Sequence, residues 1–201
     1  MYITQNRVIL MINGCTKNSF CELLDEETKK FLCQHVTITY QTPKQITNYL
    51  SQGNFQIVSE GVLLKYTLLE DGTQKSIDII KAGELLGEHL LFDNIEYPEY
   101  STMALTEVKI CNYPIQMIRQ LFNENRQFAY ALTQSLTKRV TKNQTFWVKL
   151  HSLPGAEKVQ LIYDTLKELD VDLQLITQED LALMAGVSRI TVARAMKNIQ
   201  I

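Results

Sequence analysis

The spacing of hydrophobic residues changes along this chain and divides it into three regions. Between about Val36 and Tyr113, short apolar runs at strand period are separated by turn residues. After Pro114, apolar residues recur every three or four positions as far as Leu150, with no glycine or proline between them. Helical spacing then resumes in shorter segments. The pattern therefore predicts a mainly β region, one long helix and a helical end.

One turn signal stands out in the β region. Glu70-Asp71-Gly72 lies between two strand-like runs, which predicts a β-hairpin.

The long helix carries an apolar seam broader than a single small domain needs, so it either covers a core or pairs with a second copy. The seam consists of Ile118, Leu121, Phe122, Phe128, Leu132, Leu136 and Val140.

The last 25 residues carry the most specific local signals. Thr177 stands at a helix N-cap position with Asp180 three residues later, and Gly186 follows where a helix often ends in a left-handed residue. Ser188 can then cap a second helix. Two short helices joined by a tight glycine turn are typical of a helix-turn-helix, in which the second helix enters the major groove of DNA.

The second helix carries side chains suited to DNA. Arginine can form two hydrogen bonds to guanine or hold a phosphate, and serine and threonine hydroxyls can bond phosphate oxygens. Ile190 has no polar group, so it can only pack or contact a thymine methyl. The alternative is a helical hairpin with solvated arginines. The candidate DNA-binding residues are Ser188, Arg189, Ile190, Thr191, Arg194 and Lys197.

With these residues identified, the chain resembles the Crp/Fnr superfamily of bacterial transcription regulators. The resemblance covers nearly the whole chain, and its most specific parts are the helix-turn-helix and the Gly-Glu-x-x-Gly-Glu stretch. It implies an α+β fold with an N-terminal β-roll (a cyclic-nucleotide-binding-like jelly roll), a long dimerisation helix and a C-terminal helix-turn-helix. The matching segments are Phe20 to Leu24 followed by an acidic helix, Gly61 to Tyr66, Glu70 to Gly72, Gly83 to Glu88, Leu90 to Phe92, and Ile176 to Ile199.

The resemblance also points to an effector pocket at Gly87, Glu88, His89, Tyr100 and Ser101. Members that bind cyclic nucleotide use a Gly-Glu pair for the ribose and an Arg-Ser pair for the cyclic phosphate. Here residues 93–101 contain no arginine, so the phosphate of a cyclic nucleotide lacks the guanidinium that would bond it bidentately. We therefore do not expect cyclic AMP to bind, and we interpret Glu88 as a structural carboxylate bonded to nearby backbone. The effector is unknown.

The four cysteines leave three interpretations open. Oxygen-sensing members of the superfamily hold an iron-sulfur cluster on three N-terminal cysteines and one before the long helix, and Cys15, Cys21 and Cys111 resemble three of these positions. Ile12 stands where another cysteine is expected, and Cys33 lies in an apolar helical context. The alternatives are a thiol-disulfide switch and unrelated core thiols, so no metal site is favoured.

Composition narrows the class of protein. The chain has 201 residues, of which 45% are hydrophobic and 21% charged, enough for a proper core in one or two domains. The N-terminal segment is too short and too polar for a signal peptide or a membrane span, which predicts a cytoplasmic protein without membrane contact. No phosphate-binding glycine loop, nucleophile elbow or metal-spaced histidine set is present, so we predict no enzyme.

Together these observations predict a β-roll sensor at residues 1–114, a dimerisation helix at 115–150, and a DNA-binding domain at 151–201, with a hinge between His151 and Gly155. The expected partners are double-stranded DNA, a second copy of the chain and RNA polymerase. A basic tract from Lys138 to Lys149 either attracts phosphates or is a solvated face. The family's C-terminal wing is either absent or truncated. The alternative function is a small-molecule-binding protein whose helical end contacts protein.

Overall fold

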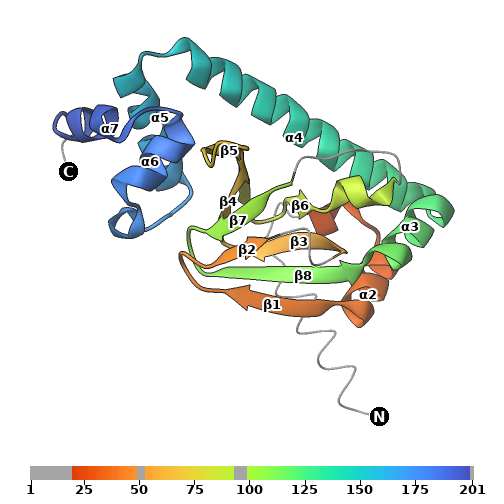
Figure 1. Ribbon diagram of the computed structural model, residues 1–201. Coiled ribbons are helices and arrows are strands. Elements are labelled where there is room, and N and C mark those ends of the chain that lie inside the picture. The colour runs from red at the N-terminus through yellow and green to blue at the C-terminus, as the bar shows by residue number, and fades with distance from the viewer. Residues whose placement is uncertain (1–19, 49–52, 93–98, 200–201) are drawn as a thin grey trace.

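Eight antiparallel strands form two four-stranded sheets in the computed structural model, which describes residues 20–48, 53–92 and 99–199 (Figure 1). The first sheet has the order β1-β8-β3-β6 and the second the order β2-β7-β4-β5. The strands are β1 (Thr37–Gln41), β2 (Ile46–Asn48), β3 (Asn54–Glu60), β4 (Val62–Leu68), β5 (Gln74–Lys81), β6 (Leu85–Leu86), β7 (Ser101–Ala104) and β8 (Val108–Pro114). The mainly β region is confirmed.

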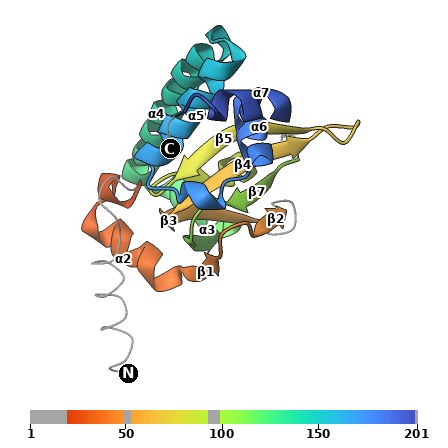
Figure 2. The same ribbon diagram turned by 90° about the vertical axis from the view of Figure 1, so that its left-hand side faces the viewer.

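Helices lie at both ends of this sandwich and along one side of it (Figures 1 and 2). The long helix α4 runs past the strands and connects α2 and α3 at one end with α5, α6 and α7 at the other. The helices are η1 (Phe20–Leu23), α2 (Glu26–His35), η3 (Glu88–Leu91), α3 (Ile115–Glu124), α4 (Arg126–Ser152), α5 (Gly155–Glu168), η4 (Leu173–Leu175), α6 (Gln178–Ala185) and α7 (Arg189–Met196). No described helix is long and apolar enough to cross a membrane.

The predicted hairpin is formed by β4 and β5. The backbone N–H of Leu69 donates to the carbonyl of Thr73 over 2.8 Å, and Gly72 adopts a left-handed φ of 80°. A residue without Cβ is favoured at such a φ. The turn signal in the sequence therefore located the hairpin correctly, and Figure 2 shows it projecting from the sandwich.

The predicted single long helix is wrong, because the structure divides it at Asn125. This residue has extended backbone angles (φ −111°, ψ 101°), and its side chain accepts a hydrogen bond from the Phe128 amide over 2.9 Å. The same side chain donates to the Thr28 hydroxyl of α2 over 3.1 Å. An asparagine that caps a new helix can end the previous one without glycine or proline, which is why the sequence pattern did not show the break.

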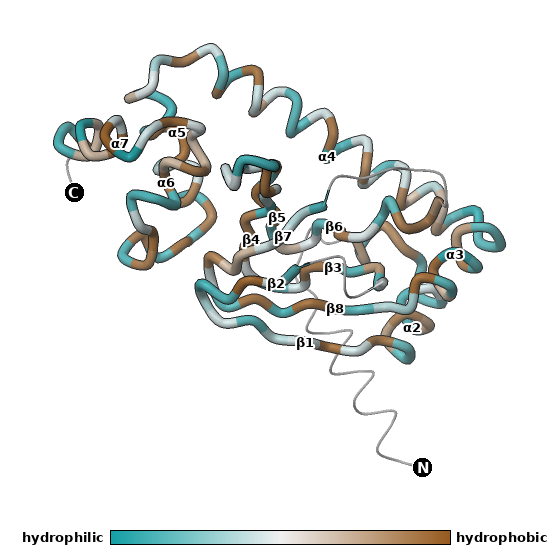
Figure 3. Tube along the Cα trace, in the orientation of Figure 1, coloured by the Kyte–Doolittle hydropathy of each residue, from teal (hydrophilic) through white to brown (hydrophobic). Residues whose placement is uncertain are grey.

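Strand β4 is buried on both faces, and this explains its nearly continuous apolar sequence. Leu63 faces the interior of the roll with Ile80 and Ala104. Leu64 and Tyr66 face the other way, into a core shared with α5, α6 and α7. A strand covered on both sides needs no polar alternation, and Figure 3 shows the hydrophobic residues along it.

The C-terminal helices are therefore packed directly against the β-roll. Their shared core contains Met103 and Leu105 from the sheet side and Val159, Leu181 and Val192 from α5, α6 and α7. Lys44 in the β1–β2 turn adds an ion pair to Asp180 of α6. In this conformation the helical end and the sandwich form one continuous packing unit.

Candidate functional sites

The two short helices α6 and α7 begin and end as their sequence predicts. The Thr177 hydroxyl accepts from the Asp180 amide over 3.2 Å, and the Asp180 carboxylate accepts from the Thr177 amide over 2.7 Å, which completes a capping box. Gly186 is left-handed with φ 64°, and the Ser188 hydroxyl caps α7 at the Thr191 amide. The predicted caps and turn are confirmed.

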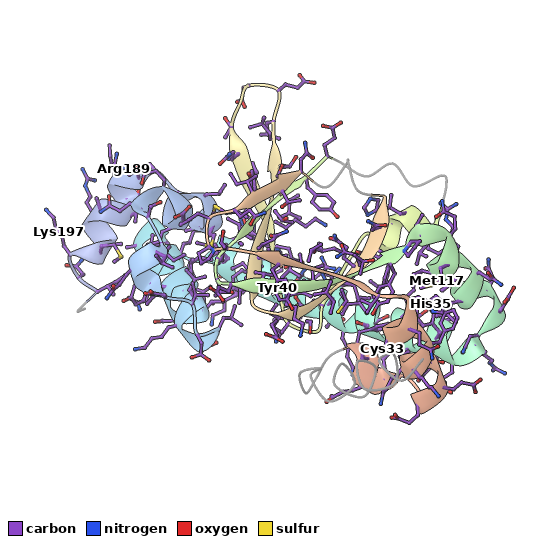
Figure 4. The ribbon with its side chains drawn as sticks, turned by 90° about the horizontal axis from the view of Figure 1, so that it is seen from below. Cys33, His35, Tyr40, Met117, Arg189 and Lys197 are labelled. Carbon is purple, nitrogen blue, oxygen red and sulfur yellow. The ribbon has the colours of Figure 1, made fainter. Side chains whose placement is uncertain are left out.

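One face of α7 is buried and the other is open. Val192 and Ala195 pack in the shared core, as the apolar spacing predicted. Ser188, Arg189, Ile190, Arg194 and Lys197 are exposed, and Thr191 is half-buried beside the Ser188 hydroxyl. Figure 4 shows Arg189 and Lys197 projecting from the outer end of the molecule. The six predicted residues thus lie on α7 and its two capping positions, Ser188 and Lys197, with a basic outer surface.

Arg189 has a neighbour that the sequence did not suggest. Its Nε lies 3.0 Å from Oε1 of Glu179 on α6, and both side chains are exposed. The contact is through Nε, and the guanidinium carries further N–H donors that can bond to another group. Exposed ion pairs contribute little to stability, so the contact orients the arginine more than it stabilises the helices.

Asp180 links this helical pair to the sandwich. Burial raises its pKa, but hydrogen bonds from Lys44 and Thr177 outweigh burial and hold the pKa below the ordinary value. The carboxylate is therefore ionised at neutral pH. It both caps α6 and anchors α6 to the β1–β2 turn.

The predicted effector pocket contains a buried network of charged side chains. Arg139 of α4 donates from Nη1 to Glu88 Oε1 over 3.1 Å and to the Leu85 carbonyl over 2.6 Å. Its Nε and Nη2 each lie 3.0 Å from Asp78 Oδ2 on β5. Asn143 donates to the same Asp78 oxygen over 2.8 Å. The partner of Glu88 is thus a guanidinium from the long helix, which corrects the expectation of a backbone partner.

Lys65 adds a second buried cation to the same interior. Its side chain is 1% exposed, and its ammonium lies 3.8 Å from the centre of the Tyr100 ring. Burial lowers the pKa of Lys65 to about 8, although the charge of Glu88 opposes this. Burial also lowers the pKa of His89, which stacks edge-to-face with Tyr100. Gly87 is buried with φ 82°, and Ser101 begins β7.

Sequence reasoning missed Lys65, Asp78 and Arg139, which make this network. One signal was available for Arg139, because it follows Leu132 and Leu136 on the core-facing stripe of its helix. A lone arginine on an apolar stripe indicates a buried partner. Nothing in the local sequence around Asp78 or Lys65 identifies that partner.

The cysteine interpretations are tested only in part. Cys15 lies outside the described residues, whereas Cys21 and Cys111 are half-buried and pack against the same apolar cluster. Cys33 is half-buried on α2. Among the described residues no group of three metal-ligating side chains comes together. The cluster and the switch therefore remain predictions.

Known proteins share the arrangement of the β-roll and the helices. A family model described as "Cyclic nucleotide-binding domain" matches residues 45–125. The matched segment includes strands β3 to β8 of the sandwich and α3. No curated protein matches the chain in sequence.

Solved structures extend the likeness beyond that domain. The c-di-GMP-responsive global regulator CLP of Xanthomonas campestris is 20% identical, with a TM-score of 0.65, over 88% of this chain and 92% of that one. A protein of Eubacterium rectale described as a regulator of the Crp/Fnr family is 13% identical, with a TM-score of 0.69, over 88% and 84%. FixK2 of Bradyrhizobium japonicum is 15% identical, with a TM-score of 0.64, over 82% and 84%. The resemblance to Crp/Fnr proteins is thereby confirmed at the level of the fold.

Proposed function

We propose that this chain is a transcription regulator that binds double-stranded DNA through α6 and α7 as a helix-turn-helix. The observation that carries the proposal is the exposed basic face of α7, presented by a capped helical pair in a Crp/Fnr-like fold. Arg189 and Arg194 are the base-reading candidates, and Lys197 is a phosphate contact. On this proposal residues 1–114 sense a signal, 115–150 join two copies, and 151–201 bind DNA in the cytoplasm beside RNA polymerase.

We place the homodimer contact on the solvent side of α4. Val140 and Val148 are 54% and 71% exposed, and Trp147 lies on the same side. The surface continues to Phe92 and Phe122, which stack edge-to-face. An apolar stripe of this length on a long helix fits a second copy of the same helix. Two such copies would present two α7 helices to half-sites about 34 Å apart.

The charged network in the interior of the β-roll argues against a cyclic nucleotide as the signal. The carboxylate of Glu88, which corresponds to the ribose ligand of nucleotide-binding relatives, is already bonded to Arg139. A cyclic nucleotide would have to break that contact, and residues 93–101 contain no arginine at the position where nucleotide-binding relatives hold the cyclic phosphate. The proposal therefore assigns the interior a structural role and does not include cyclic AMP as effector.

DNA selection tests the proposal. The full chain should enrich a roughly two-fold-symmetric sequence from random duplexes. Arg189→Ala should then cost about 1–3 kcal/mol on that sequence and relax one base position, because a bidentate contact to a base is lost. Lys197→Ala should weaken binding to selected and random duplexes alike. It should also reduce the slope of log affinity against log salt concentration by about one, because one phosphate contact is lost.

Two results would contradict this assignment. No enrichment above random duplexes would favour a helical end that contacts protein. Equal loss on selected and random DNA for Arg189→Ala would remove its base-reading role while leaving phosphate binding in place.

A further inference from the structure

A cavity of about 330 Å³ lies between three elements that are far apart in the sequence. Its walls come from η1 (Phe20 and Leu23), from the turn between β5 and β6, and from one side of α4. The volume is at the lower end of the range of about 300–1,000 Å³ for small-molecule sites. None of the effector residues expected from the sequence lines it. It is therefore a second concave site, outside the interior of the roll.

The lining of this cavity is basic. Four cations surround it, against the carboxylates of Glu22 and Glu84. The guanidinium of Arg139 is already neutralised by Asp78 and Glu88. The cations are Lys81, Lys138, Arg139 and Lys142.

The remaining charges do not cancel within the cavity. Lys142 Nζ lies 3.2 Å from Glu84 Oε1, and Glu84 Oε2 accepts from the Lys81 backbone amide over 3.0 Å. Both oxygens of Glu84 are thus occupied. Within the described ranges, no ion pair joins the ammonium groups of Lys81 or Lys138 to any carboxylate. Two lysine ammonium groups therefore face this pocket against the single further carboxylate of Glu22, which leaves an excess of positive charge beside the hydroxyl of Ser135.

We infer that this cavity binds a small phosphate monoester. The phosphate carries close to two negative charges at neutral pH and accepts hydrogen bonds from ammonium and hydroxyl groups. Lys81, Lys138 and Ser135 provide such donors around the pocket, while Phe20 and Leu23 provide an apolar wall for the organic part. The ligand joins the end of β5 to α4, next to the Asp78–Arg139 pair, and so strengthens the contact between the sandwich and the long helix.

Calorimetric titration of the full chain without DNA tests the inference. Phenyl phosphate should bind more tightly than inorganic phosphate, because its ring contacts the apolar wall. Lys81→Met and Lys138→Met should each weaken phenyl phosphate about tenfold, since each removes one charge-assisted hydrogen bond. Lys149→Met is the matched control, because Lys149 lies on the same helix outside this cavity, and its affinity should equal that of the parent chain.

Three outcomes would overturn the inference. The first is no binding heat from phenyl phosphate beyond that of sodium chloride at equal ionic strength. The second is a loss of affinity in Lys149→Met as large as in the other two variants, which would indicate attraction by the general positive charge of the surface and not by this cavity. The third is unchanged affinity for phenyl phosphate in Lys81→Met and Lys138→Met; weaker binding of the same variants in a separate duplex-DNA titration would then assign these lysines to the DNA backbone. Because the phenyl phosphate titration contains no DNA, its result is independent of the proposed DNA binding.

Discussion

The α6–α7 pair and the interior of the β-roll are both polar sites, but they are built from opposite kinds of interaction. In the helical pair, the Thr177 and Ser188 caps bond amides three residues away, and the turn between the helices depends on one glycine. In the interior, Arg139 is 61 residues from Asp78 and 51 residues from Glu88 in sequence. The first site is encoded locally and could be read from the sequence. The second exists only because the fold brings separate segments together.

The interior network should be the more sensitive of the two to a single substitution. Arg139→Met leaves Asp78 and Glu88 buried without their cation, so we expect the free energy of unfolding to fall by about 3–5 kcal/mol. Urea unfolding followed by circular dichroism measures this loss. Lys138, the exposed residue next to Arg139, provides the control, and Lys138→Met should change the free energy of unfolding by less than about 0.5 kcal/mol. A loss for Arg139→Met no larger than the control's would show that the network is not a stabilising element.

The pH dependence of stability isolates Lys65 within the same network. Its pKa is about 8 in the folded chain and 10.5 in the unfolded reference. Between these values the unfolded state binds more protons, so the free energy of unfolding should rise with pH, by at most about 1.4 kcal/mol per unit. Urea unfolding of the parent chain and of Lys65→Met over this interval compares the two slopes. Identical slopes would mean that Lys65 titrates normally.

The helical pair should respond less in stability and more in DNA binding. Gly186→Ala places a Cβ on a residue with φ 64° where no other atom lies within 4 Å, so the expected cost of about 1 kcal/mol comes from backbone strain alone. Selected DNA should also bind more weakly, because the turn sets the angle of α7. Gly72→Ala is the matched control, since Gly72 is also left-handed and uncrowded but lies in the β4–β5 turn. It should lose similar stability and keep the DNA affinity of the parent chain.

The sequence by itself determined the elements whose signals act within a few residues. The hairpin at Gly72, the break after Ser152 and both helices of the C-terminal pair lie where side-chain chemistry predicted them. Caps and left-handed turns involve neighbouring amides, so their geometry follows from the local residues. The division of the long helix escaped this reasoning because Asn125 made it without glycine or proline.

Only the tertiary structure decided which charges meet. Lys65, Asp78, Glu88 and Arg139 come from β4, β5, η3 and α4, and the free energy of each contact depends on distance and burial. The same is true of Lys44 and Asp180, which fix the helical pair to the sandwich. Ion pairs between distant segments leave no periodic pattern in the sequence, because desolvation and Coulomb energy are properties of the assembled interior.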